Sequence, residues 1–380
     1  MISLSSSVIL PGSTIGIIGG GQLGRMMAIE ARHMGYKIAV LDPTPNCPCG
    51  QIADIEITAP YNDLEAIKQL AEVSDVITYE FENIDYEALK WLEENAYLPQ
   101  KSKLLLLTQD RETEKAAIRE AGCEVAPYQI VHNEQELLQA IEELSIPAVL
   151  KTCRGGYDGK GQVVLKTSED VEAAKKLLDH GTCILEKWVP FEKEISVIVT
   201  RSVSGETSVL PVAENVHKEN ILYQSIVPAR ITLAVYEEAQ RQALRIANYF
   251  GLVGTLAVEM FLTNDGYIYI NELAPRPHNS GHYSMDLCET DQFEQHVRAI
   301  CNLPLGRTTL LQKGIMVNLL GEDLHILDER LSLFNAAKLY LYGKGEPLPK
   351  RKIGHVNFLT EANEKLLNEI DSIWNINGRR

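Results

Sequence analysis

The chain has 380 residues, 45% of them hydrophobic and 23% charged, which is typical of a folded globular protein and excludes a largely disordered one. Its 52 acidic and 36 basic residues give a formal net charge of −16, which disfavours nucleic acid as a partner because like charges repel. The length is enough for two or three domains of ordinary size.

The N-terminal ten residues lack the basic start of a signal peptide, and no apolar stretch approaches the roughly 20 residues of a membrane span. We therefore expect a cytoplasmic protein with no membrane partner. The seven cysteines have no repeated metal-ligand spacing, and their odd number favours reduced thiols. Cys47 and Cys49 are predicted to lie in a solvent loop, with a metal or redox pair as the alternative.

Apolar runs at residues 14–18, 37–41 and 75–79 are each followed by polar or glycine residues, and a helical pattern covers 22–33. Such alternation is typical of parallel α/β domains, in which ligands bind at the carboxyl ends of the strands. The sequence therefore predicts a parallel α/β domain over residues 1–108.

A glycine turn after the first predicted strand formally matches the dinucleotide fingerprint. Its glycines are Gly19, Gly21 and Gly24, and Asp42 lies near the place where an acidic residue would accept ribose hydroxyls. The pattern needs only backbone amides at a helix start, so it fits any phosphate, and a simple tight turn is the alternative.

A second glycine-rich loop, residues 154–162, follows a predicted strand at 147–150. Its four glycines and nearby lysines allow it to close over a triphosphate and donate hydrogen bonds to it. The loop lacks the Gly-Lys-Ser/Thr ending of a P-loop, which excludes that family. A solvated hairpin is the alternative.

The segment 183–189 is strand-like, and Glu194 opens a further predicted strand at 195–200. Main-chain groups of the first segment would hydrogen-bond an adenine edge, and Glu194 would accept ribose hydroxyls. Ordinary sheet without a ligand is the alternative. We place these segments in a central domain over 109–305, with subdomains of about 109–187 and 188–305, followed by a small C-terminal domain over 306–380.

Two strand-like runs, 256–262 and 267–272, flank Asn264-Asp265-Gly266 and predict a β-hairpin. A two-residue turn at Asp265-Gly266 would place Glu259 opposite Glu272. Two carboxylates opposed on one sheet face repel each other unless a cation lies between them, and magnesium suits two carboxylates completed by phosphate oxygens. A pair pointing into solvent is the alternative.

Two polar segments complete the pattern. Residues 273–282 place Arg, His and Asn in a Pro- and Gly-constrained loop, which predicts a pocket of donors for a compact anion. Residues 342–355 form a basic cluster suited to a phosphate monoester. A packed loop and a solvated basic run are the respective alternatives.

Taken in order, these motifs resemble the ATP-grasp superfamily and, within it, the family of N5-carboxyaminoimidazole ribonucleotide synthetases of purine biosynthesis. The matching pieces run from residue 19 to 355 and are GGGQLGRM, YEFEN, GGYDGKGQ, LEKWVPFEKE, VEMF, INELAPRPHNSGH and KRKIGH. The resemblance implies an ATP-grasp fold of mixed α/β and α+β class, with an N-terminal parallel α/β (pre-ATP-grasp) domain, a central ATP-grasp domain and a small C-terminal domain.

The resemblance also implies a reaction. Bicarbonate would attack the γ-phosphate of ATP to give carboxyphosphate and ADP, and the amine of 5-aminoimidazole ribonucleotide would take up the activated carbon. ATP would be a co-substrate, Mg²⁺ (or Mn²⁺) the cofactor, and a homodimer the oligomeric state. Functional coupling to the downstream mutase is left open.

The site residues implied by the resemblance fall into four groups. Those for ATP are Arg111, Lys151, Gly156, Tyr157, Asp158, Gly159, Lys160, Gly161, Gln162, Glu186, Lys187, Trp188, Val189, Glu194, His217, Asn271 and Glu272. Those for magnesium are Glu259 and Glu272. Those for catalysis are Asp158, which would orient the substrate amine, and Arg276, His278 and Asn279, which would contact bicarbonate and carboxyphosphate. Those for the ribonucleotide are Gln22, Leu23, Glu80, Lys344 and Arg351, with amides of the glycine turn receiving its phosphate.

Other readings share some of these features. A formate-dependent glycinamide ribonucleotide transformylase or a biotin carboxylase would share the ATP apparatus, but the first gives no reason for the loop at 273–282 and the second is usually longer. An NAD-dependent oxidoreductase would explain only residues 14–42. A catalytically silent nucleotide sensor would most simply have lost a carboxylate, and Glu259 and Glu272 are both present.

Overall fold

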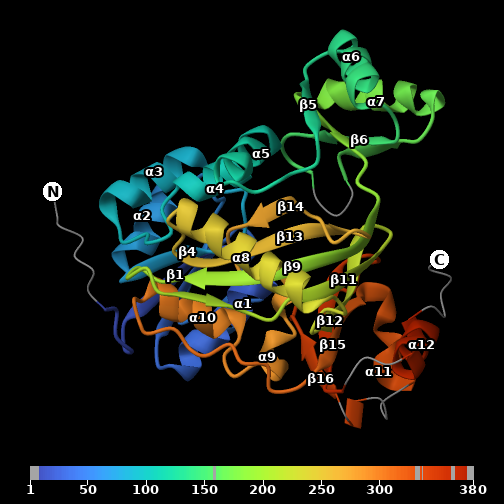
Figure 1. The fold of residues 1–380 in the computed structure, drawn as a ribbon. Coiled ribbons are helices and arrows are strands. Elements are labelled where there is room, and N and C mark those ends of the chain that lie inside the picture. Colours follow the sequence, from blue (N-terminus) through green and yellow to red (C-terminus); the bar gives the residue numbers. More distant parts are fainter. Residues whose placement is uncertain (1–7, 157–159, 330–333, 336, 361–363, 375–380) are drawn as a thin grey trace.

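The computed structural model describes residues 8–156, 160–329, 334–335, 337–360 and 364–374 (Figure 1). Tyr157, Asp158 and Gly159, which the sequence predicts to contact ATP, lie outside the described residues. Among the described residues, no helix is long and apolar enough to cross a membrane.

The N-terminal part is a four-stranded parallel sheet, as the sequence predicts. Its strands lie in the order β3 (Ile55–Thr58), β2 (Lys37–Asp42), β1 (Thr14–Ile18) and β4 (Val76–Tyr79). The connecting helices are α1 (Gln22–His33), α2 (Leu64–Glu72) and α3 (Tyr86–Asn95). Because the strand order reverses between β1 and β4, the loops after these two strands meet at one edge of the sheet.

A small antiparallel sheet projects from the rest of the molecule (Figure 1). Its strands lie in the order β5 (Tyr128–Val131), β8 (Cys183–Lys187), β6 (Ala148–Thr152) and β7 (Gln162–Leu165). Helices α6 (Glu134–Leu144) and α7 (Val171–Leu177) pack on it, and α4 (Lys103–Thr108) and α5 (Arg111–Glu120) lead into it. The glycine-rich loop joins β6 to β7 and therefore lies at one end of this sheet.

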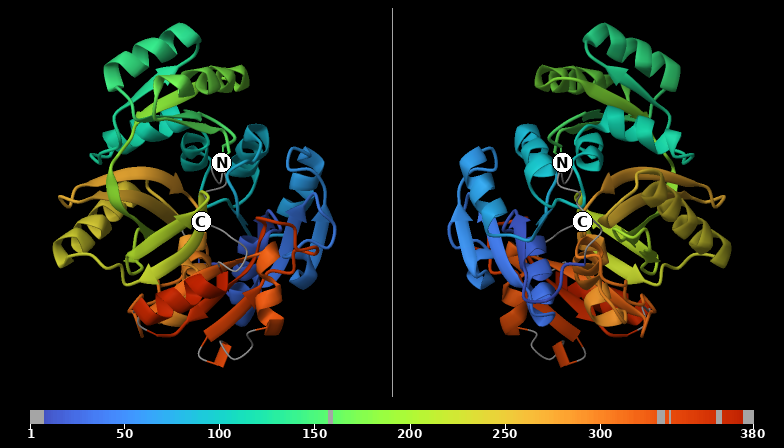
Figure 2. Two further views of the ribbon diagram at one scale, coloured as in Figure 1. Left: turned by 90° about the vertical axis from the view of Figure 1, so that its right-hand side faces the viewer. Right: turned by 90° about the vertical axis from the view of Figure 1, so that its left-hand side faces the viewer.

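The largest sheet is antiparallel and joins the central and C-terminal parts of the chain. Its strands are β9 (Phe191–Arg201), β10 (Thr207–Val209), β11 (Ala213–Lys218), β12 (Ile221–Val227), β13 (Gly254–Thr263), β14 (Ile268–Ala274), β15 (Gly314–Leu320), β16 (Ala337–Leu341) and β17 (Lys352–Phe358). The order is β14-β13-β9-β11-β12-β15-β17-β16, with β10 beside β9. Pairing of β12 with β15 makes the strands after residue 306 a continuation of the central sheet (Figure 2).

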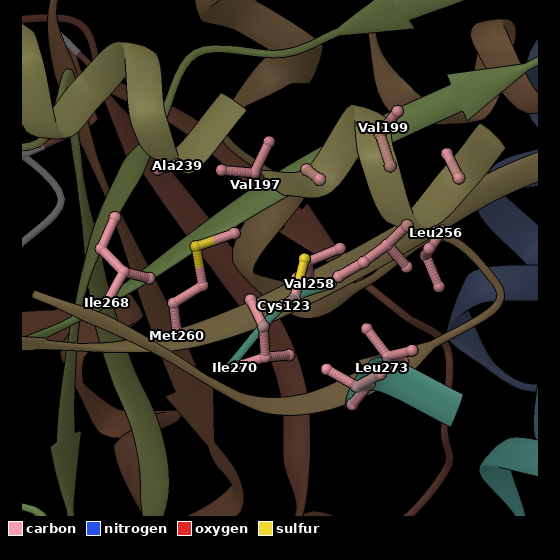
Figure 3. Close-up of a cluster of buried hydrophobic side chains, with 14 of the residues drawn as sticks. Cys123, Val197, Val199, Ala239, Leu256, Val258, Met260, Ile268, Ile270 and Leu273 are labelled. Carbon is pink, nitrogen blue, oxygen red and sulfur yellow. The ribbon is translucent and has the colours of Figure 1, made fainter. Parts of the chain in front are cut away.

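The remaining helices are α8 (Leu233–Tyr249), α9 (Ser284–Leu287), α10 (Gln292–Ile300), α11 (His325–Glu329) and α12 (Glu364–Trp374). Helix α8 covers one face of the large sheet, where Val197, Val258 and Ile270 of three neighbouring strands meet Ala239 (Figure 3). These side chains alternate along their strands with residues of the opposite face. Burial of each valine or isoleucine side chain contributes about 1.5–3 kcal/mol to the stability of the fold. The sheet is therefore a rigid base for the polar side chains on its other face.

The N-terminal sheet and the large sheet share a core. Helix α1 packs against α10, and Met27 and Ile38 lie in one apolar cluster with Phe293 and Val297. The carboxyl ends of the parallel strands are thereby held next to the β14–α10 segment, where Arg276 pairs with Glu82 in the loop after β4.

The side chains of Cys47 and Cys49 are buried although residues 43–46 of the same loop are exposed, so the prediction that these cysteines lie in a solvent loop was wrong. Both side chains are at most 2% exposed. The loop packs beneath the glycine turn, where the Cys49 amide donates to the carbonyl of Gly20 at 2.9 Å. Burial raises the pKa of both thiols, which keeps them protonated and unreactive.

We expect the protein to lose stability in acid because two of its histidines are buried. His296 and His355 are fully buried, and burial lowers the pKa of each to about 3. An unfolded histidine has a pKa near 6.5, so between these values only the unfolded chain binds the proton. This stability is complete above about pH 6.5 and is lost as pH falls, by roughly 2 kcal/mol per histidine at pH 5.

The measurement is urea unfolding at pH 7.5 and pH 5.0. We expect the stability lost between these two pH values to be smaller in His296→Gln than in the parent, by roughly the 2 kcal/mol that one histidine contributes. His33→Gln, at a histidine whose side chain is 70% exposed, is the control and should leave the difference unchanged. Equal losses in the His296 variant and the parent would contradict the assignment.

Candidate active site

The hairpin of β13 and β14 places Glu259 opposite Glu272, as predicted, although the predicted turn was wrong. Thr263 rather than Asn264 pairs with Tyr267, so the loop has three residues and ends in Gly266 with φ +84°. This shifts the register by one along Met260–Leu262. A bulge at Asn271 restores the register, since Glu259 faces Glu272 while Met260 faces Ile270.

Glu259 and Glu272 have different electrostatic surroundings. Burial, followed by the charge of Glu272, raises the pKa of Glu259 to about 7. Burial alone would also raise the pKa of Glu272, but Arg111 and Lys151 outweigh it and lower that pKa. Nη1 of Arg111 lies 3.3 Å from the Glu272 carboxylate. The surroundings therefore favour the ionised form of Glu272 and disfavour that of Glu259, which is the condition that a bound cation would relieve.

This pair fits a divalent cation that is shared with a ligand. The described part of the chain has no cluster of three or more His, Cys, Asp and Glu side chains placed to hold a metal. A cation at Glu259 and Glu272 would therefore need ligand oxygens to complete its shell, as magnesium does with nucleotide phosphates.

A buried charge triad joins the small sheet to this hairpin. Glu186 on β8 accepts from Lys151 on β6 at 2.5 Å and lies 2.9 Å from Lys115 on α5. Burial would raise the pKa of Glu186, but the two lysines outweigh it and lower it. Lys115 also donates to the carbonyl of Asn271 at 2.6 Å, so it fixes the bulge of the hairpin.

Lys115 is a site residue that the sequence interpretation missed. It belongs to no glycine-rich or carboxylate motif, and its helix has an ordinary amphipathic pattern. The available signal is the adjacent Glu114, which falls on the buried stripe of α5 with Ala117 and Ile118. Glu114 accepts from the Leu273 amide at 2.7 Å, and burial raises its pKa to about 8.

Glu194 and His217 face each other across the neighbouring strands β9 and β11. The Nδ1 atom of His217 lies 3.2 Å from Glu194, and this contact outweighs burial to raise the pKa of His217. Next to Glu194, Phe191 stacks on Phe261 with ring centroids 4.7 Å apart. Trp188 is partly exposed at the end of β8, so the edge predicted for adenosine combines aromatic faces with a carboxylate.

The loop at 273–282 turns back against the hairpin and the N-terminal sheet. Arg276 pairs with Glu82 at 2.8 Å, while its buried Nε has no hydrogen-bond partner among the described residues. Nε2 of His278 lies 3.4 Å from Glu259. Burial, followed by the charge of Arg276, lowers the pKa of His278 well below its usual value, so the imidazole is neutral. Asn279 exchanges two hydrogen bonds with Asn318, at 2.9 and 2.7 Å.

The glycine turn is filled largely by carboxylates of its own domain. The amides of Gly21 and Gly24 donate to Glu80, and the amide of Gly20 donates to Asp42 at 2.7 Å. Asp42 also accepts from Thr44 and from the hydroxyl of Tyr61. Its carboxylate is thus occupied by protein donors, which argues against the ribose contact of an NAD-binding domain.

Two helix-start amides remain available in this turn. Gln22 and Leu23 are the first residues of α1, and their amides have no acceptor among the described residues. They lie beside Glu80. Burial raises the pKa of Glu80, although the hydrogen bonds from the amides of Gly24 and Gly21 oppose this shift. The structure therefore brings together the predicted ribonucleotide contacts Gln22, Leu23 and Glu80, next to the loop at 273–282.

The other predicted ribonucleotide contacts lie in the C-terminal segment. Lys344 is in the loop between β16 and β17, and the carbonyl of its neighbour Gly343 accepts from Gln51, in the turn between β2 and β3, at 2.9 Å. Arg351 is exposed and lies directly before β17. Among the described residues, its side chain has no hydrogen bond or ion pair with Gln22, Leu23 or Glu80. The structure thus ties the loop of Lys344 to the N-terminal domain, and the placement of Arg351 at the ribonucleotide stays a prediction.

The described ends of the glycine-rich loop are closely packed. The Thr152 amide donates to the carbonyl of Gly161 at 2.9 Å, and Gly161 has φ +71°. A Cβ atom at Gly156 would lie 2.9 Å from the carbonyl of Lys160, so glycine is required for the two ends to approach. Gln162 begins β7 opposite Lys151, which places both loop ends beside the charge triad.

A glycine-rich loop on a small sheet, opposed glutamates on a larger one and a buried lysine between them define an ATP-grasp protein. Family models agree, matching an ATP-grasp domain at 116–293, a ribonucleotide synthetase preATP-grasp domain at 12–109 and a phosphoribosylaminoimidazole carboxylase C-terminal domain at 314–369. The chain is an ADP-forming ATP-grasp enzyme, and the predicted fold class is confirmed. It belongs to the N5-carboxyaminoimidazole ribonucleotide synthase family of purine biosynthesis.

The relatives support this assignment over nearly the whole chain. The Bacillus subtilis N5-carboxyaminoimidazole ribonucleotide synthase is 61% identical over 98% of this chain and 98% of its own. An ADP complex of an N5-carboxyaminoimidazole ribonucleotide synthetase has a TM-score of 0.95 at 62% identity, covering 97% of this chain and 98% of that one. The Aspergillus clavatus enzyme, solved with ADP and 5-aminoimidazole ribonucleotide, has a TM-score of 0.88 at 31% identity, covering 96% and 98%.

Proposed function

We propose that this chain uses ATP and bicarbonate to carboxylate the exocyclic amine of 5-aminoimidazole ribonucleotide. A bicarbonate oxygen attacks the γ-phosphorus, the bond to ADP breaks, and carboxyphosphate forms. Carboxyphosphate then gives carbon dioxide and phosphate, and the amine attacks the carbon and loses a proton. The observation that carries the proposal is the position of Glu259 and Glu272 directly beside the Arg276–Asn279 loop.

ATP would lie between the small sheet and the large one. Arg111, Lys151, Lys160 and the amides near Gly156 and Gly161 would surround the phosphates, since each can donate hydrogen bonds to them. The adenosine end would lie along Glu186 to Val189, with Glu194 and His217 at the ribose. Tyr157, Asp158 and Gly159 complete this proposed set.

Magnesium would be held by Glu259 and Glu272 and would neutralise phosphate charge, with Asn271 beside the phosphates. The side chain of Asn271 supports this placement, because its buried Oδ1 has no hydrogen-bond partner among the described residues. The Nδ1 atom of the neutral His278 shares a hydrogen bond with the hydroxyl of Ser280. Its Nε2 atom therefore faces the proposed magnesium site.

The anion and the ribonucleotide would meet at the loop after β14. Arg276 would stabilise the charge of bicarbonate and carboxyphosphate, with His278 and Asn279 orienting the oxygens. The ribonucleotide would lie toward the N-terminal sheet, its phosphate near Gln22, Leu23, Lys344 and Arg351. Glu80 would contact its ribose side, and Asp158 would orient its amine.

Three further features belong to the proposal. The domains would be residues 1–108, 109–305 and 306–380. The protein would act as a cytoplasmic homodimer. Its product would pass to a mutase as the next enzyme of the pathway.

The test is an assay for ADP and phosphate with each component omitted in turn. We expect full turnover only with ATP, magnesium, bicarbonate and 5-aminoimidazole ribonucleotide together. Bicarbonate labelled with ¹⁸O should transfer one labelled oxygen to the released phosphate, because the attacking oxygen stays on phosphorus. Turnover supported by formate, or a change in nicotinamide absorbance with an added alcohol, would contradict the proposal.

A further inference from the structure

Gln292, at the start of α10, binds both backbone groups of His278. Its Oε1 accepts from the His278 amide at 2.8 Å, and its Nε2 donates to the His278 carbonyl at 2.8 Å. The same Nε2 lies 3.0 Å from Nδ1 of His282. Gln292 is fully buried, so water does not compete for these bonds.

The position of His278 depends on this side chain. His278 lies in a Pro- and Gly-constrained turn outside the sheet ladder, and the acceptor of its backbone N–H is the Gln292 side chain. One planar amide that satisfies both its N–H and its C=O fixes the backbone and hence the direction of the imidazole toward Glu259. Gly281 packs against the amide, since a Cβ atom there would overlap Oε1 of Gln292.

Gln292 is itself held rigidly. Asp291 caps α10 by accepting from the Phe293 and Glu294 amides at 2.7 and 3.0 Å. The backbone N–H of Gln292 donates to the hydroxyl of Ser284 at 3.1 Å, and Phe293 is buried in the core shared with α1. The loop carrying His278 is thereby tied to the core shared by α1 and α10 as well as to the hairpin.

We propose that Gln292 is a positioning residue for carboxyphosphate formation, acting through the backbone of His278. This inference rests on the proposed function, because it assumes that His278 contacts the reacting anion. Without Gln292, the His278 amide loses its acceptor and the His278 carbonyl keeps only the Gly281 amide, so the loop relaxes. Misplacement of a reacting group by about 1 Å costs on the order of 100-fold in rate.

Gln295 provides a matched control on the same helix. It is also fully buried, and it binds both backbone groups of one residue, accepting from the Gly306 amide at 2.9 Å and donating to the Gly306 carbonyl at 2.6 Å. Gly306 lies outside the candidate site. Removal of either glutamine thus deletes the same type of interaction, but only Gln292 serves the catalytic loop.

The experiment compares Gln292→Met and Gln295→Met in kcat, KM and thermal midpoint. We expect similar losses of thermal midpoint, about a 100-fold lower kcat only in Gln292→Met, and an ATP KM within about two-fold of the parent in both. Equal kcat in the two variants would overturn the inference. A parent enzyme without turnover dependent on bicarbonate and 5-aminoimidazole ribonucleotide would instead overturn the proposed function.

A second variant decides the question if Gln292→Met does not fold. Gly281→Ala keeps Gln292 but pushes its amide away from His278, and the backbone at 281 has no positive φ to strain. A fall in kcat with little change in the ATP KM would support the inference. An unchanged kcat would overturn it.

Discussion

Glu272→Gln and Glu259→Gln are each expected to lower the rate of bicarbonate-dependent ADP release by about 10²–10³-fold, the usual loss on removing a group that stabilises developing charge. Each change removes a negative charge from the proposed magnesium site, so the magnesium concentration needed for half-maximal rate should rise. The structural consequences differ, because Arg111 pairs with Glu272 and not with Glu259.

This difference gives the prediction a second readout. Without magnesium, Glu259→Gln should leave the thermal midpoint unchanged or raise it, because it removes a carboxylate whose ionised form is disfavoured by burial and by the charge of Glu272. Glu272→Gln should lower the midpoint, because Arg111 loses its partner. Glu65→Gln, at a glutamate whose side chain is 77% exposed, is the control for both measurements. Unchanged magnesium dependence in both glutamate variants would contradict the site.

The carboxylate pair could be predicted from sequence although the turn could not. The prediction used a two-residue turn, whereas the structure has a three-residue loop and a compensating bulge at Asn271. The bulge is held from a distance, since Lys115 donates to the Asn271 carbonyl and the Ile270 amide donates to the backbone carbonyl of Glu124 at 2.7 Å. A local turn rule contains no information on such contacts.

Local motifs were the predictable part of the fold and of the site. The α/β alternation identified β1, β2 and β4, because buried parallel strands are continuous apolar runs, but it missed β3, whose residues are mostly exposed. The glycine turn was located correctly, yet nothing in its spacing indicates that Glu80 and Asp42 fill three of its amides. Those contacts arise only when the strands are placed side by side.

Residues that act through tertiary contacts were the unpredictable part. Gln292, Glu82 and Lys115 each touch a predicted site residue, but none belongs to the motif that it serves. The local sequence around a buried polar residue on an amphipathic helix does not indicate which loop it binds. Gln292 and Gln295 lie on one helix, but Gln295 binds a loop outside the candidate site. Only the packing distinguishes the two.

Lys115→Met is expected to destabilise the protein by about 3 kcal/mol, the lower end of the range for breaking a buried ion pair. The side chains of Lys115 and Glu186 are 1% and 5% exposed, so Glu186 cannot be rehydrated without local opening. Lys151 still compensates part of its charge, which is why the lower end applies. The bulge at Asn271 also loses its donor, so the KM for ATP should rise.

The measurement is a double-mutant cycle by urea unfolding with Lys115→Met, Glu186→Gln and the combined variant. Because a buried pair replaced by neutral groups of similar size is often tolerated, the combined variant should be more stable than Lys115→Met alone. Lys175→Met, which removes a lysine paired with an exposed glutamate, should cost much less stability than Lys115→Met, because water screens an exposed pair. A loss for Lys115→Met no larger than for Lys175→Met would show that Lys151 alone neutralises Glu186, and the buried triad would then reduce to a pair.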